Sequence, residues 1–132
     1  MRFLVMVKAT KEWTGELPSE KMGAFNDGLI RDGVLLAAEG LQPSAKGARI
    51  NYVDLRPVVT DGPFTESKEL VAGFWILQAR SKAELIERFA DCPFEGGESI
   101  EIRQIFEAED FAGDEAIMKR LDTAAYKPQK VT

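Results

Sequence analysis

Residues 2–8 read Arg-Phe-Leu-Val-Met-Val-Lys, a short apolar run with a basic residue at each end. Successive side chains of a strand point to opposite faces of the sheet, so this run predicts a central strand that is covered on both faces. Residues 71–79, Val-Ala-Gly-Phe-Trp-Ile-Leu-Gln-Ala, form a second core strand of this kind. Gly73 within it indicates that another segment approaches the backbone closely.

Two helices are expected after these strands. Pro18 and Ser19 open the first, and Gly33 is placed to end it. Its apolar side chains follow the spacing of one helix face: Met22, Phe25, Leu29 and Ile30. The second helix starts at a capping box, Ser81-Lys82-Ala83-Glu84, and ends before Pro93. We expect it to bury Leu85, Ile86 and Phe89.

The other extended segments complete the pattern. Residues 34–38 form a strand that runs into Glu39-Gly40-Leu41. Residues 48–53 alternate and residues 57–60 return, which predicts an exposed β-hairpin at the sheet margin, where Pro57 is tolerated. Residues 99–106 alternate again. In that last strand one face would carry Ile100, Ile102 and Phe106.

The order of elements decides the fold class. Without the hairpin it is β-α-β-β-α-β, so the sequence predicts an α+β, ferredoxin-like split βαβ sandwich with an inserted β-hairpin. Residues 1–110 would form this domain, and residues 111–132 a C-terminal helix, capped by Asp114, with a loose tail. Two helices cover only one sheet face, and the other is also apolar. We expect a second copy to cover it, which makes the protein a homodimer.

Composition and charge exclude several classes of function. The chain of 132 residues carries a net charge of −5 and no run of Lys or Arg, which argues against nucleic-acid binding. Its longest apolar run is too short to span or anchor in a membrane, and no signal peptide is evident. The single cysteine, Cys92, cannot form an internal disulfide. These features together predict a cytoplasmic protein.

The chain contains no histidine. A Ser-His-Asp triad, a Cys-His pair and a histidine-ligated zinc or haem are therefore excluded. We expect no cofactor and no metal site, although the sequence does not exclude a cation held by carboxylates. Acid–base chemistry would need a carboxylate or lysine whose pKa the fold has shifted.

The densest polar cluster lies at residues 61–69, Asp-Gly-Pro-Phe-Thr-Glu-Ser-Lys-Glu. Gly62 and Pro63 restrict the turn, which presents its carboxylates from a stiff loop. Asp61 is the candidate acid or base, and Lys68 would stabilise developing negative charge. The candidate substrate-binding residues are Glu39, Phe64, Glu66, Glu69 and Trp75. The alternative is that Asp-Gly-Pro is an ordinary turn, Phe64 a core residue and the charges a solvated surface.

Four further residues have a structural and a functional interpretation. Cys92 is expected to be a buried small hydrophobe rather than a nucleophile. Trp13 follows the first strand and is a candidate lid, although most loop residues have no such role. Lys8 and Arg49 would neutralise an anionic ligand if they were not simply solvated.

The sequence also resembles a known family, the YCII-related proteins, in the subgroup named for its Asp-Gly-Pro-Phe motif, the DGPF domain. That motif is Asp61-Gly62-Pro63-Phe64, and the resemblance includes the segments 38–43, 60–61, 73–75 and 100–103. It also includes Glu66, Lys68 and Glu69. It covers roughly residues 1 to 110.

The resemblance implies a dimeric α+β barrel, like that of muconolactone isomerases and small monooxygenases. Better-understood branches of the family are associated with a His–Asp pair and hydrolytic or dehalogenating chemistry. Asp61 matches the acidic member, whereas the histidine has no counterpart in this chain. DGPF domains are also associated with sigma-factor-like regulatory proteins.

Two functions follow as hypotheses. The first is a small-molecule binding protein or enzyme with a pocket near the Asp-Gly-Pro-Phe loop. The second is a non-catalytic protein-interaction or regulatory module, in which Asp61 would cap its own turn.

Overall fold

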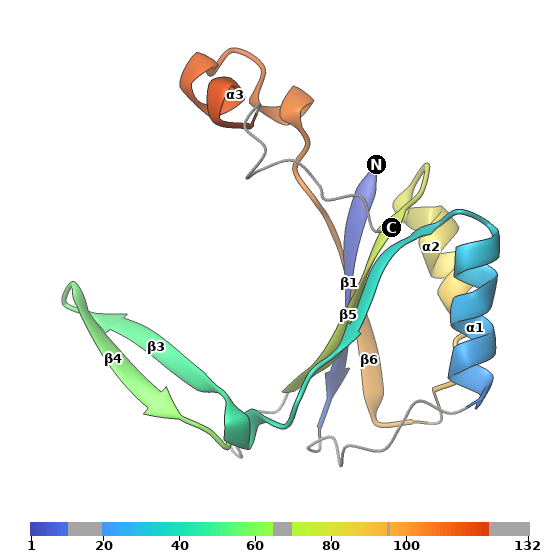
Figure 1. Ribbon diagram of the computed structural model, residues 1–132, viewed down its shortest axis with the longest axis horizontal. Coiled ribbons are helices and arrows are strands. Elements are labelled where there is room, and N and C mark those ends of the chain that lie inside the picture. The colour runs from blue at the N-terminus through green and yellow to red at the C-terminus, as the bar shows by residue number, and fades with distance from the viewer. Residues whose placement is uncertain (11–19, 65–69, 95, 122–132) are drawn as a thin grey trace.

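The computed structural model describes residues 1–10, 20–64, 70–94 and 96–121. Its elements follow in this order: β1 (Arg2–Ala9), α1 (Glu20–Arg31), β2 (Leu35–Gly40), the short 3-10 helix η1 (Ser44–Lys46), β3 (Ala48–Val53), β4 (Arg56–Asp61), β5 (Leu70–Gln78), α2 (Lys82–Phe89), β6 (Glu98–Gln104), a second 3-10 helix η2 (Ala108–Phe111) and α3 (Glu115–Leu121). Figure 1 shows α1 and α2 together on one side of the main sheet.

The main sheet has four antiparallel strands in the order β2-β5-β1-β6. The two strands predicted to be central, β1 and β5, pair along their whole length, from Arg2 opposite Gln78 to Ala9 opposite Leu70. With two helices on one face, this is the ferredoxin-like arrangement. The predicted α+β fold class is therefore confirmed.

The core lies between the sheet and the two helices. Alternate residues of β1 and β5 face the helices, and the buried set comprises Phe3, Val5, Leu29, Val34, Trp75, Leu77 and Leu85. Phe25, Trp75 and Phe89 pack edge to face, with ring centroids 5.2–6.4 Å apart. Burying a side chain of this size stabilises the fold by roughly 1.5–3 kcal/mol.

The helix-end signals that fall on described residues are largely confirmed, whereas Pro18 and Ser19 lie outside the described residues. Gly33 adopts a positive φ of 69° after α1, as a C-cap requires. The hydroxyl of Ser81 accepts a hydrogen bond from the amide of Glu84 at 3.2 Å. The return bond differs from a complete capping box, because the carboxylate of Glu84 accepts from the amide of Arg80.

In both helices, fewer residues are buried than the sequence predicted. Ile30 is 59% exposed and Ile86 is 55% exposed in the single chain. Each follows a fully buried leucine, Leu29 or Leu85, which occupies the centre of the contact with the sheet. The next position on a helix is turned by about 100° and here faces away from the sheet. The predicted burial of both isoleucines is therefore wrong.

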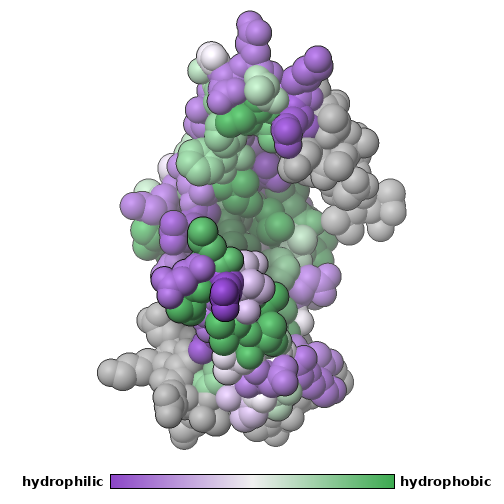
Figure 2. Space-filling model, turned by 90° about the vertical axis from the view of Figure 1, so that its left-hand side faces the viewer, coloured by the Kyte–Doolittle hydropathy of each residue, from purple (hydrophilic) through white to green (hydrophobic). Residues whose placement is uncertain are grey.

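The opposite face of the main sheet carries no helix among the described residues. Directly paired residues share a face, so this open face carries Leu4, Met6, Lys8, Ala37, Glu39, Phe74, Ile76, Glu101 and Arg103. Its apolar side chains are half-buried. Figure 2 views the molecule from this side and shows apolar surface in a hollow between two projecting segments.

The hairpin β3–β4 is one of these projecting segments. It was predicted at the margin of the main sheet, but it forms a separate two-stranded sheet and projects away (Figure 1). After Gly40 only the amide of Leu41 continues the bonding to β5, and η1 then turns the chain away from the sheet. The predicted hairpin is confirmed, whereas its predicted place is wrong.

The segment after β6 is the second projection. The sequence predicted Phe106 on the same strand face as Ile100 and Ile102, but β6 ends at Gln104 and Phe106 lies beyond it, so this prediction is wrong. Phe106 is 71% exposed and packs against Phe111 with centroids 5.2 Å apart. The chain then forms η2 and α3, and the carboxylate of Asp114 accepts from the amide of Ile117, which confirms the predicted cap.

Candidate functional site

The turn at residues 61–64 packs tightly against η1. The amide of Gly62 donates to the carbonyl of Gly47 at 3.0 Å, and the amide of Phe64 donates to the hydroxyl of Ser44 at 2.9 Å. The Gly62–Pro63 peptide bond is cis. A Cβ on Gly62 would overlap the carbonyl group of Ser44, so only glycine fits there. The turn thus fastens the base of the hairpin to the segment that leaves β2.

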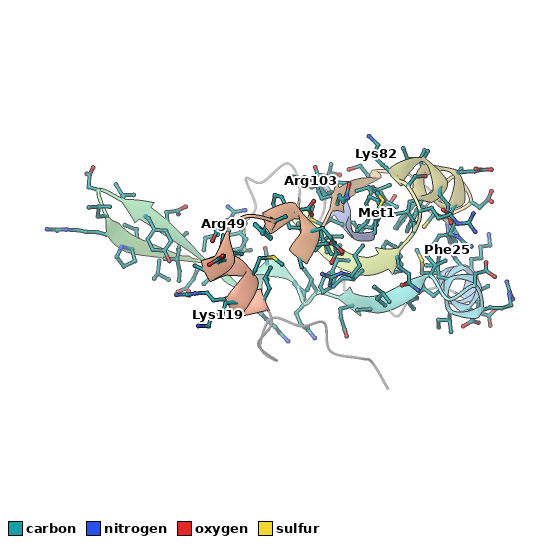
Figure 3. All side chains as sticks on the ribbon, turned by 90° about the horizontal axis from the view of Figure 1, so that it is seen from above. Met1, Phe25, Arg49, Lys82, Arg103 and Lys119 are labelled. Carbon is teal, nitrogen blue, oxygen red and sulfur yellow. The ribbon has the colours of Figure 1, made fainter. Side chains whose placement is uncertain are left out.

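Phe64 has a partner on the hairpin. The guanidinium carbon of Arg49 lies 4.0 Å from the centroid of the Phe64 ring, the geometry of a cation–π contact. Seen from above, Arg49 lies between the main sheet and the tip of the hairpin, on the opposite side of the sheet from Phe25 (Figure 3). In the described structure, the Phe64 side chain therefore packs against the base of the hairpin.

Asp61 and Glu39 lie on different elements near this base. Asp61 ends β4 opposite Ala48 and is exposed. No hydrogen bond joins its carboxylate to another side chain or amide of the described residues. Glu39, also exposed, pairs with Phe74 and so lies on the open face, near the end of β2 that leads into η1. Both carboxylates are accessible to a ligand.

An ion pair occupies the same end of the open face. The Nζ of Lys8 lies 3.0 Å from Oε1 of Glu101, and Arg103 approaches the other oxygen at 3.5 Å. The Lys8 side chain is only 18% exposed. The hydrogen bond from Lys8 and its charge hold the pKa of Glu101 below its ordinary value of 4.5. This cluster places fixed charges beside the apolar side chains of Met6 and Phe74.

Trp75 does not share this environment. It is 5% exposed in the helix-side core, and its indole nitrogen donates to Asn26 at 2.9 Å. Phe74, its neighbour, faces the open side instead. Of these two adjacent aromatic residues, Phe74 therefore lies on the open face with Glu39, whereas Trp75, the predicted substrate-binding residue, lies in the helix-side core.

Several predicted site residues lie outside the described residues. They are Trp13, Glu66, Lys68 and Glu69. Within the described part of the chain, no group of three or more carboxylates, cysteines or histidines is close enough to hold a metal ion. A cavity of about 230 Å³, lined by Gln104, Ile105, Phe106 and Asp110, lies away from the Asp61 turn.

Cys92 is half-buried beside the helix-side core. Burial raises the pKa of its thiol to about 11, so the thiol stays protonated near neutral pH. A protonated thiol is a poor nucleophile. This supports the structural interpretation of Cys92.

The sequence shows that Lys8 and Glu101 are charged residues in two strands, but the alternation of apolar residues does not show that the two side chains meet. Lys8 ends the first strand, and Glu101 interrupts the apolar positions of the last. Only the antiparallel register, which sets Met6 opposite Glu101 and Lys8 opposite Ser99, makes the two side chains diagonal neighbours on one face. Pairing of these two strands was needed to predict the contact.

Comparisons with known proteins complete the description. Residues 1–109 match the family model of the YCII-related domain. No curated protein sequence matches the chain. Within the described residues, no helix is long and apolar enough to cross a membrane.

Proposed function

The chain belongs to the family of YCII-related domain proteins, and from that premise we propose that it binds a small molecule at the hairpin end of the open sheet face. One observation carries the proposal: Glu39 and the Lys8–Glu101 pair are set into a half-buried apolar face beside Met6 and Phe74. A few polar groups converging on an apolar surface are typical of ligand sites.

Asp61 supplies the acid or base at this site if the ligand reacts, and Lys68 supplies a positive charge. Asp61 is exposed in the single chain. A second copy on the open face would remove water from this end of the sheet. A carboxylate enclosed with a bound ligand and shielded from water is well placed for proton transfer. The proposed site is thus completed by a homodimer.

A thermal-shift screen of purified protein tests the proposal. It uses a few hundred metabolites and divalent cations, because a ligand that binds the folded state raises the unfolding midpoint whatever its chemistry. Asp61→Asn and Glu39→Gln are screened in parallel. Asp54→Asn is the matched control, since Asp54 lies at the opposite end of the same hairpin with a positive φ that asparagine tolerates.

We expect a ligand whose shift is lost in Asp61→Asn and Glu39→Gln and kept in Asp54→Asn. A ligand that shifts all four proteins equally would contradict this site. Turnover of that ligand, followed by mass spectrometry, would then distinguish an enzyme from a binding protein.

The second candidate function is a protein-interaction module. It is favoured by the contacts of the Asp61–Phe64 turn, in which Gly62 and Phe64 hold the hairpin base together. In that case the motif is structural, and its task is to present the hairpin. Phe64→Ala, which removes the contact with Arg49, would then lower the unfolding midpoint without changing any ligand response.

A further inference from the structure

The hairpin β3–β4 has one face that is apolar beyond its base. Directly paired residues share a face, and the pairs Ile50–Val59 and Tyr52–Pro57 fall on the same one. Ile50, Tyr52 and Val59 are 53%, 76% and 62% exposed. The opposite face is mixed, because it carries Arg49, Asn51, Val53, Arg56, Val58 and Thr60.

This exposure is concentrated in the hairpin. Six of the thirteen exposed large hydrophobic side chains of the described residues belong to it: Ile50, Tyr52, Val53, Leu55, Val58 and Val59. A two-stranded hairpin alone is at best marginally stable in water. An apolar patch on such an element marks a surface that another molecule covers.

The placement of the hairpin indicates which molecule covers it. The hairpin and the segment η2–α3 both project on the side of the sheet opposite the helices, and the open face lies between them (Figures 1 and 2). A partner seated on the open face would therefore contact both projections. A second copy meets this requirement by symmetry, because it brings the same three surfaces.

The two projections also complement each other. Residues 107–121 carry five acidic and two basic side chains, and Met118 among them is 37% exposed. Phe106, which directly precedes them, is 71% exposed. The hairpin offers the apolar face of Ile50, Tyr52 and Val59, which can pack against these exposed apolar side chains. A two-fold rotation that stacks the open faces with the strands reversed brings the hairpin of one copy to the η2–α3 segment of the other.

We propose that the hairpin is an arm that packs its Ile50–Tyr52–Val59 face on a second copy of this chain, beside that copy's segment 105–121. Asp61 lies on the same hairpin face, opposite Ala48 at its base. Each arm therefore presents Asp61 toward the interface, so the ligand site proposed above is complete only in the dimer. This inference rests on the homodimer of the proposed function.

A pair of adjacent valines provides the test. Val59 and Val58 follow each other in β4, lie on opposite hairpin faces and are 62% and 47% exposed. Val59→Asp and Val58→Asp thus introduce the same charge and the same loss of β-propensity. Sedimentation equilibrium measures the dimer dissociation constant of each. We expect Val59→Asp to raise it about tenfold or more and Val58→Asp to change it by about threefold at most.

Photo-cross-linking identifies the contact directly. A benzoylphenylalanine is placed at position 52, and in a control protein at position 51, on the other face. Mixing ¹⁴N- and ¹⁵N-labelled copies separates cross-links between copies from those within one chain. We expect a mixed-isotope product only from position 52, with the second peptide within residues 105–121.

The outcomes separate the two proposals. A dimer that Val59→Asp and Val58→Asp weaken equally, or that shows no mixed-isotope product from position 52, overturns the arm and leaves the homodimer standing. A wild-type protein that stays monomeric at tens of micromolar overturns both. A ligand that binds a stable dimer equally well in Asp61→Asn refutes the ligand site and leaves the arm untouched.

Discussion

Gly62 has no side chain, and this allows the Asp61–Phe64 turn to pack directly against the backbone of Ser44. A Cβ at this position would lie 2.6 Å from the carbonyl carbon of Ser44, and a contact this close forces the backbone to move. Gly23 in α1 is the opposite case, because a Cβ there would meet nothing within 4 Å. The two glycines therefore respond to alanine in opposite directions.

We expect Gly62→Ala to lower the free energy of unfolding by about 1–3 kcal/mol, the cost of overpacking a tight contact. Gly23→Ala, the control, should raise it by up to ~1 kcal/mol, because alanine favours the helix and loses less entropy. Urea unfolding measures both. A Gly62→Ala protein that unfolds at the wild-type midpoint would show that the turn does not pack on Ser44.

The Lys8–Glu101 pair makes stability depend on pH in a defined direction. The hydrogen bond and charge of Lys8 lower the pKa of Glu101 in the folded protein below the ordinary 4.5. A lowered carboxyl pKa stabilises the fold above the unfolded-state pKa, and this contribution disappears as the pH falls through the folded-state pKa. The window for the effect thus lies from about pH 4.5 downward.

Glu101→Gln should accordingly be less stable than the wild-type protein at pH 6 to 7, and the difference should shrink below pH 4.5. Urea unfolding from pH 3 to 7 measures it. Lys8→Gln is the control, since it removes the same pair from the other side. In the Lys8→Gln protein, adding Glu101→Gln should therefore change the stability much less, and with a weaker dependence on pH. A difference between wild type and Glu101→Gln that does not vary with pH would disprove the pairing.

At this scale, the predictable features were those set by local backbone chemistry. Gly33 as a C-cap, Gly73 as a close approach and Asp114 as a cap are confirmed, and a Cβ on Gly73 would lie 2.8 Å from the carbonyl oxygen of Glu39. The exposure of Ile30 and Ile86 was not predictable from periodicity. Periodicity identifies an apolar stripe, whereas the width of the covered part depends on how the helix packs on the sheet.

At the scale of elements, α2 shows how a local signal starts a helix. The Ser81 hydroxyl satisfies the Glu84 amide, one of the four amides that a helix start leaves without an intrahelical partner. We expect Ser81→Ala to lower the free energy of unfolding by about 1 kcal/mol. Ser99→Ala, in an exposed strand position, should change it by about 0.5 kcal/mol or less. Equal effects in urea unfolding would argue against the cap.

The hairpin shows the limit of element-level prediction. Its alternation and turn were sufficient to predict two paired strands, because both signals are local. The position of the hairpin relative to the main sheet was not predictable, because it depends on whether β3 can pair with the edge strand β2. Here the η1 turn and the contacts of Gly62 and Phe64 with Gly47 and Ser44 direct it away from that edge. The same contacts decide where Asp61 lies, so the candidate site was predictable only in part.

At the scale of the whole molecule, the open face is the feature that the single chain leaves unexplained. Leu4, Met6, Phe74 and Ile76 are half-buried there, opposite a fully packed helix side. A sheet in a two-layer domain must cover its apolar face. The strand order was predictable from the βαβ pattern, and a sheet of this order with two helices leaves one face without a helix. What covers it is not encoded in any local signal, which is why it requires measurement.

Ile76→Lys tests whether a second copy covers the open face. Ile76 lies opposite Leu4 on that face, and a charge there would have to be buried in a homodimer. Ile86→Lys is the matched control, because Ile86 is 55% exposed on α2, on the helix side of the sheet. We expect light scattering to give twice the 14.7 kDa of one chain for the wild-type protein and for Ile86→Lys. Ile76→Lys should elute as a folded monomer, with unchanged far-UV circular dichroism. If Ile76→Lys remains dimeric, the second copy binds elsewhere, and the half-buried face must be covered by another segment or partner.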